Sequence, residues 1–293
     1  MSVQHLTADD DENANRYVLA AKLNNSKTLA SILKAIHFSD HATFCGLPSG
    51  LKAIVEDFQC VQGNAFIDAQ IFQSYELIKN IRFRIHLNTL LECLNIFGLS
   101  ENSDSIVALQ IYYMGEGHPL QLYLEEHGVI TECSIKLLDA DETIDFEFQT
   151  ENILAKIMLK ADGFKEALSE IDLKADCIEL LISEQNPQFR LIANGVGGSS
   201  SVDITKTSEI MESFLCTQTI HNRYKTQFFQ YIIKALTIAT KVSLRIDGRG
   251  ILCIQFLIYT EEDKASLVEY FFCPSDEIDD QTNMQTNDDS NQV

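Results

Sequence analysis

The chain repeats one pattern of secondary-structure signals, and the second copy begins about 137 residues after the first. Each copy opens with a short strand signal, followed by an amphipathic helix and, later, by a second apolar helix. These paired signals lie at 17–23 and 154–160 (strand), 26–36 and 162–171 (helix), and 87–97 and 226–237 (helix). A duplication of this length predicts two similar α+β domains side by side rather than one catalytic core.

Further strand signals fill both copies, and many of them alternate apolar and polar residues between Gly, Pro, Asn and Asp turns. In the first copy they lie at 42–47, 51–56, 60–68, 74–77, 81–85, 106–114, 120–125 and 129–137. In the second copy they lie at 177–183, 189–194, 200–205, 211–216, 242–247, 252–259 and 267–273.

Changes in composition divide the chain. Residues 1–15 are polar and acidic, and residues 275–293 are rich in Asp, Asn and Gln, so both ends are expected to be disordered. The acidic stretch 138–145 lies between the two copies and predicts an interdomain connector. The expected domains are therefore 16–137 and 146–274.

Bulk composition restricts the classes of partner. The formal charge of −21 repels free nucleic acid on average, so contact with DNA needs the few cations gathered on one surface. The eight cysteines are widely spaced, the closest pair being Cys45 and Cys60, which excludes CxxC zinc or redox pairs and indicates reduced intracellular thiols. No stretch approaches the roughly 18 apolar residues of a membrane span, so no membrane partner is expected.

Two of the helix signals carry polar faces that lack acids. Lys27, Ser31 and Lys34 lie opposite the apolar face of 26–36. In 226–237 the polar stripe consists of Gln227, Gln230, Lys234 and Thr237, with Lys225 and Lys241 beside it. Such faces suit a surface that contacts phosphates, and they equally suit an ordinary solvated helix. The other two helices carry no Lys or mix Lys165 with acids, so any cationic lining is partial.

Several segments, in a fixed order over some 260 residues, are similar to a known family. They are SILKAIHF (31–38), NAFI (64–67), LECLNIFG (91–98), LYLEE (122–126), FKEALSE (164–170), NRYK (222–225), KAL (234–236) and VEYFFCP (268–274). From about residue 16 to 274 the chain resembles the PCNA-like sliding clamps. Within that family it resembles the Rad-one subunits of the heterotrimeric DNA-damage checkpoint clamp, the nine-one-one complex.

The resemblance implies a duplicated clamp fold of two β-α-β-β-β-α-β-β-β domains, with helices around a central hole and sheets outside. The lysines expected to face enclosed DNA are Lys27, Lys34, Lys225, Lys234 and Lys241. Lys234 matches a lysine of such clamps, whereas Glu166 stands where they tend to carry a basic residue.

The resemblance also implies surfaces for other proteins. Subunits of such rings join by pairing of edge strands, here the last strand of domain one and a strand of domain two. The residues assigned to this joint are Val129, Ile130, Thr131, Cys133, Ile135, Phe189, Leu191 and Ala193. An outer groove for partner peptides is expected beside the connector, at Leu137, Leu138 and Ile144.

The function implied by the resemblance is that of a non-catalytic subunit of a heterotrimeric checkpoint clamp in the nucleus. Two other clamp subunits complete the ring, an ATP-driven loader places it around double-stranded DNA, and checkpoint and repair proteins dock at the outer groove. No catalytic residue, metal or cofactor is expected. The chain has no GxxxxGK[ST] phosphate loop, which fits a passive clamp.

Two alternatives stay open on sequence alone. A metal-dependent 3′-to-5′ DNA exonuclease would need clustered carboxylates, and the nearest candidates are Asp145 and Glu147, with Asp139, Asp141 and Glu142 close by. The same acids also suit a solvated connector. The second alternative is a protein-interaction scaffold that does not contact DNA.

Overall fold

The computed structural model describes residues 17–57, 59–98, 106–260 and 263–275. The expected lead-in at 1–15 lies outside these residues, as does the expected acidic tail apart from Ser275. Among the helices that are described, none is long and apolar enough to span a membrane.

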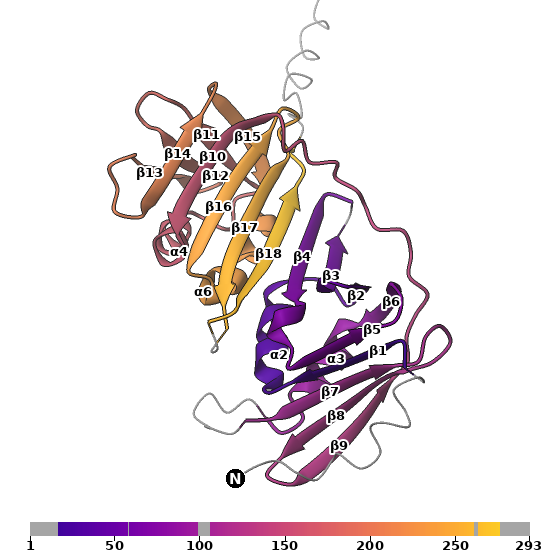
Figure 1. Cartoon of the computed structure of the whole chain (residues 1–293). Coiled ribbons are helices and arrows are strands. Elements are labelled where there is room, and N and C mark those ends of the chain that lie inside the picture. Colours follow the sequence, from indigo (N-terminus) through magenta and orange to yellow (C-terminus); the bar gives the residue numbers. More distant parts are fainter. Residues whose placement is uncertain (1–16, 58, 99–105, 261–262, 276–293) are drawn as a thin grey trace, which may run out of the picture.

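Two domains with the same order of elements follow one another along the chain (Figure 1). The first contains β1 (Leu19–Leu23), α2 (Ser26–Ala35), β2 (His41–Leu47), β3 (Gly50–Asp57), β4 (Val61–Asp68), η1 (Ala69–Ile71), β5 (Ser74–Leu77), β6 (Ile81–His86), α3 (Leu87–Leu94), β7 (Ala108–Tyr113), β8 (Leu120–Glu126) and β9 (Val129–Ile135). The second contains β10 (Ile153–Lys160), α4 (Ala161–Ser169), β11 (Cys177–Ile182), β12 (Phe189–Gly195), β13 (Gly198–Ile204), β14 (Met211–Cys216), β15 (Ile220–Lys225), α5 (Thr226–Tyr231), α6 (Ile233–Ile238), β16 (Lys241–Asp247), β17 (Leu252–Tyr259) and β18 (Ala265–Phe272).

The strand order demonstrates the duplication directly. In the first domain the strands run β5-β1-β7-β8-β9 and β4-β3-β2-β6, and in the second β14-β10-β16-β17-β18 and β13-β12-β11-β15. These orders are the same position by position. Strand β18 pairs with β4 and so joins the two domains in one nine-stranded sheet. We call this pairing the domain joint. The duplicated α+β clamp fold expected above is confirmed.

The helices form one row across both domains. Helix α2 packs against α3 and, across the domain joint, against α6, which in turn packs against α4. Asn25 caps α2 by accepting a hydrogen bond from the Lys27 backbone N–H at 3.0 Å. Leu29, Ile32 and Leu33 are buried beneath this helix, so its polar residues lie on the far side of the row.

The structure differs from the sequence-based expectation in several elements. Helix α3 ends at Leu94, and the helix expected at 226–237 is divided into α5 and α6 at Ile232. Each domain has five strands between its helices, where the resemblance implied three and the strand signals indicated five in the first copy and four in the second. Strand β15 was not expected, because only Ile220 and Tyr224 of its six residues are buried and its other residues are polar.

Candidate nucleic-acid interface and assembly surfaces

The domain joint is held on its helix side by Tyr270 of β18. This side chain is fully buried, and burial raises the pKa of its hydroxyl. The hydroxyl donates across the joint to the Ala35 carbonyl at the end of α2, and it lies 3.3 Å from the Tyr231 carbonyl of α5. Phe38 stacks on Tyr231, with ring centroids 4.6 Å apart. Gly63, directly opposite Tyr270 on β4, leaves space for these rings.

The other side of the domain joint carries a chain of polar contacts. Glu269 of β18 accepts from Gln255 at 3.0 Å and from Asn64 of β4 at 3.5 Å. Gln62 extends the chain by donating to Glu56 and to the Ile144 carbonyl, each at 2.7 Å. The joint therefore has an aromatic side beneath the helices and a hydrogen-bonded side facing away from them.

Two strands equivalent to those of the domain joint are free edges in this chain. By strand order, β9 corresponds to β18 and β13 corresponds to β4. On β9, Val129 is 59% exposed and Ile130 is 52% exposed, which leaves apolar side chains at an unpaired edge. Strand β9 is thus the last strand of its sheet among the described residues, and its use as a subunit interface stays a prediction.

The expectation that 189–194 supplies the second edge is wrong. Strand β12 is paired on both sides, with β11 and with β13, so its backbone cannot receive a further strand. Phe189, Leu191 and Ala193 are fully buried core residues for the same reason. Among the described strands the edge is β13, which has β12 on one side and no strand on the other.

On the helix row, the structure brings Lys34 and Lys234 together. Both line a pocket of about 480 Å³ between α2, α3 and α6, together with His37 and Asn88. Lys234 donates to the His37 carbonyl at 3.3 Å, which links the second domain to the first. Burial and then the charge of Lys234 lower the pKa of the His37 imidazole, so the neutral ring is favoured.

The remaining expected DNA-facing lysines are placed differently. Lys27 lies two turns before Lys34 on α2 and is half-buried. Lys225 lines a second pocket, of about 650 Å³, together with Arg223 and the first residues of α5. Lys241 is not brought to this surface. It forms an ion pair with Glu212 at 2.8 Å, on the sheet face opposite the buried Val242.

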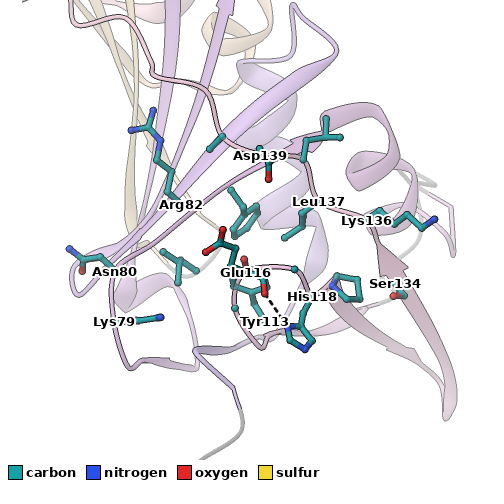
Figure 2. Close-up of a pocket in the computed structure, with 17 residues that line it drawn as sticks. Lys79, Asn80, Arg82, Tyr113, Glu116, His118, Ser134, Lys136, Leu137 and Asp139 are labelled. Atoms are coloured by element: carbon teal, nitrogen blue, oxygen red, sulfur yellow. Dashed lines mark hydrogen bonds between the residues drawn. The ribbon is translucent and has the colours of Figure 1, made fainter.

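An outer pocket of about 870 Å³ lies where the connector leaves the first domain. Figure 2 shows Glu116 and His118 of the β7–β8 loop facing Leu137, which follows β9, and Asp139 of the connector across it. Leu138 also lines it, whereas Ile144 does not. The Ile144 N–H donates to Glu56 at 2.7 Å, which holds this residue against the domain joint instead. Sequence reasoning missed the β7–β8 loop, since nothing in its turn signal places it beside the connector.

Two arginines of β6 fix the connector. The Arg84 and Leu138 backbones exchange hydrogen bonds of 3.1 and 2.8 Å. The Arg84 guanidinium forms an ion pair with Asp141, and Arg82 donates to the Asp141 carbonyl at 2.8 Å and to Thr143 at 3.1 Å. The connector therefore follows a defined path along the edge of the first domain.

The acids proposed for metal binding are engaged elsewhere or dispersed. Asp141 contacts Arg84, Asp145 accepts from the Glu147 backbone N–H at 2.8 Å, and Glu147 lies 3.9 Å from Arg249. Within the part of the chain that the structure describes, no group of three or more His, Cys, Asp or Glu is arranged to hold a metal ion.

Comparisons with known proteins agree with the fold. The family model described as "Repair protein Rad1/Rec1/Rad17" matches residues 18–258. The chain is 43% identical over 274 residues to "Cell cycle checkpoint protein RAD1" of Homo sapiens, covering 93% of this chain and 97% of that protein. It is 42% identical over 274 residues to the protein of the same name from Mus musculus, covering 93% and 98%. It is 29% identical over 259 residues to "DNA repair protein Rad1" of Drosophila melanogaster, covering 87% and 93%.

Proposed function

We propose that this chain, which belongs to the Rad1/Rec1/Rad17 family of repair proteins, is a non-catalytic subunit of a heterotrimeric checkpoint clamp that encircles DNA in the nucleus. The observation that supports this most is the repetition of the domain joint. Strands β9 and β13 are the equivalents of the two strands that join the domains, and among the described residues each has a strand on one side only. A neighbour that adds its own strand to each edge would continue the sheet and close a ring.

The two edges favour unlike neighbours. Edge β9 exposes Val129 and Ile130, whereas β13 carries Ser199, Ser201 and Asp203 outward. An apolar edge and a hydroxyl-rich edge complement each other poorly, so a ring of three identical chains is disfavoured. We therefore infer that two other clamp subunits complete the ring.

The helix row is the surface proposed to face the duplex. Lys27, Lys34 and Lys234 lie on one side of the row, opposite the sheets. A few cations suffice there, because enclosure rather than tight binding keeps the clamp on DNA, and the net charge of −21 discourages other contacts. The test is retention on nicked circular DNA after loading by the ATP-driven loader, followed by linearisation, which should release the clamp.

A charge-reversal series separates the DNA-facing role from ring assembly. Lys27→Glu, Lys34→Glu and Lys234→Glu together should lower retention at least tenfold without changing the mass of the native complex. The matched control reverses Lys52, Lys156 and Lys241, which alternate away from the buried side of β3, β10 and β16. If the helix-row variant and the control variant are retained on DNA equally, the helix row does not face DNA. If the wild-type chain has the native mass of a monomer, the proposed ring does not form.

The outer pocket is proposed to receive checkpoint and repair proteins. Its wall combines apolar side chains such as Leu137 with backbone groups and a few charged side chains, a mixture typical of binding pockets. Leu138 is 39% exposed and offers a substitution that leaves the core intact. Leu138→Asp should reduce capture of these proteins by the intact ring, and undiminished capture would place their site elsewhere.

The exonuclease alternative gains no support from the placement of the connector acids. It remains directly testable with purified protein, Mg²⁺ or Mn²⁺ and labelled single-stranded DNA. We expect no degradation above that of a mock purification. Degradation that disappears on Asp145→Ala would overturn the non-catalytic assignment.

A further inference from the structure

We propose that β9 selects a neighbour of defined chemistry, and this inference rests on the ring assembly proposed above. The neighbour's joining strand would carry a large apolar side chain opposite Ile130 and an amide donor opposite Glu132. It would also bring side-chain bulk against Cys133. A second copy of this chain lacks these features at β13.

The domain joint supplies the register for this inference. Leu120 pairs with Ile135 as Leu252 pairs with Phe272, so Cys133 occupies the position of Tyr270 and Ile130 that of Leu267. The same spacing relates β4 to β13, where the core-facing Ile67 corresponds to Ile204. By this spacing Ser200 stands at the position of Gly63, and Asp203 at that of Phe66.

On the side that faces the helices, β9 lacks a large side chain like the one that fills the domain joint. Tyr270 is fully buried and reaches the Ala35 carbonyl across the joint. At the equivalent place Cys133 is only partly buried, and its thiol meets Cys93 of α3 within its own domain. A neighbour that packed as α2 and β4 do would leave the volume of a phenol ring unfilled. The complementary neighbour therefore supplies that volume itself.

On the opposite side, the outer edge keeps the features of the domain joint. Glu132 accepts from Tyr123 at 3.3 Å, just as Glu269 accepts from Gln255 on the adjacent strand. Glu269 also accepts from Asn64 across the joint, so Glu132 lacks only the donor that a neighbour would bring. Ile130, like Leu267, requires an apolar residue opposite it.

A second copy of this chain does not meet these requirements. In the register of the domain joint, its Ser200 would lie opposite Cys133, and both residues are small. Its Asp203 would lie opposite Ile130, and that carboxylate is held by Arg190 at 2.7 Å. Pairing of β9 with β13 of a second copy would leave the space between Cys133 and Ser200 under-packed. It would also place the apolar Ile130 against the ion pair of Asp203, and both effects lower the affinity of the chain for itself.

Photo-crosslinking of the native ring tests the register. Benzoylphenylalanine at position 130, in the full chain captured through an affinity tag, should crosslink to a clamp-sized subunit. Mass spectrometry should place the link on an apolar residue that lies two positions from an amide side chain. A link to a charged residue, or to a second copy of this chain, would overturn the proposal.

Two substitutions test the energetics. Ile130→Asp and Cys133→Tyr should each reduce the co-purified β9-side subunit at least tenfold, while the β13-side subunit is retained. Leu215→Asp is the matched control, since Leu215 is 53% exposed on the unrelated edge strand β14. Cys133→Ser is the conservative control and should leave capture unchanged. If both subunits stay bound to Ile130→Asp, the inferred chemistry is wrong although the ring stands, whereas a wild-type chain without neighbours refutes the ring itself.

A rebuilt edge gives an independent readout. Cys133→Tyr, Ser200→Gly and Asp203→Phe together reproduce at the outer edges the Tyr270, Gly63 and Phe66 positions of the domain joint. We expect this variant to self-associate, with a native mass that rises with concentration. A monomer at all concentrations would contradict the equivalence of the two joints.

Discussion

Gly63→Ala should weaken the domain joint through a single methyl group. A Cβ at this position would lie 2.8 Å from Phe38 Cε1, 3.1 Å from Tyr270 Cε1 and 3.5 Å from Ile36 Cγ2. The first distance is shorter than Cβ atoms adopt in real contacts, the second is tighter than most of them, and both neighbours are aromatic rings held by other contacts. Tyr270 is tied to the Ala35 carbonyl, and Phe38 is stacked on Tyr231. Neither ring can move without disturbing a further interaction.

The magnitude follows from two opposing effects. Overpacking by one methyl group in a rigid core costs about 1–3 kcal/mol. Replacing Gly by Ala restricts the unfolded chain and returns roughly 0.4–1 kcal/mol. The steric term is the larger, so we expect a net loss of about 1–2 kcal/mol in the free energy of unfolding.

Urea denaturation followed by fluorescence and circular dichroism measures this loss. The decisive measurement is a double-mutant cycle with Phe38→Leu, which removes the nearest ring atom. Phe38→Leu alone should destabilise the protein, yet it should recover part of the loss when combined with Gly63→Ala. Gly63→Ala as stable as wild type, or strictly additive single effects, would refute the steric explanation.

Three further predictions concern the β16–β17 hairpin, the helix row and the connector. Asp247→Asn should cost about 3 kcal/mol in urea denaturation, because the amide NH2 would replace the buried Oδ2, which accepts from the Gln149 backbone N–H and the Arg249 guanidinium, each at 3.3 Å, and would leave these donors without an acceptor. The lowered pKa of His37 means that the folded state binds fewer protons, so this residue's contribution to stability is complete above pH 6.5 and is lost as pH falls through the folded pKa. Lys234→Met should raise the pKa of His37 only part of the way to its ordinary value, because burial, the larger cause of the shift, remains. NMR titration of the imidazole measures this change. Arg84→Ala should expose the connector by removing the ion pair to Asp141, and limited proteolysis should then cleave 138–145 faster than in wild type.

The repeated fold could be predicted because its signals are local. Helix α2 has apolar residues at helical spacing and an Asn cap, and both can be recognised within a dozen residues. Strand β15 could not be recognised, since its pairing with β11 satisfies a backbone whose side chains are mostly polar. The division of the helix at Ile232 likewise has no Gly or Pro to mark it.

Residues of the candidate surfaces could be predicted only where the local sequence pattern determines which face of a helix they occupy. Lys34 and Lys234 meet because their helices pack across the domain joint, and the polar stripes had identified each one separately. The prediction that Phe189 lies on an edge strand was wrong, because the sequence indicates that 189–194 is a strand but does not indicate which strands pair with it. The structure does not place Ile144 in the outer pocket, because its backbone N–H donates to Glu56 beside the domain joint. The sequence of the connector does not indicate this hydrogen-bond partner. Pairing partners at long sequence separation were the missing information in both cases.

Duplication also explains why the domain joint and the proposed outer joints differ. Both derive from one strand pair, so register and backbone geometry are shared, and only side chains distinguish them. The domain joint forms within a single chain, where the effective concentration of its halves is high, and it can use a buried Tyr270 against Gly63. An outer joint between separate chains must also reject wrong partners. Small residues such as Cys133 and Ser200 weaken self-pairing, and a specific neighbour that supplies the missing volume gains selectivity from the same positions.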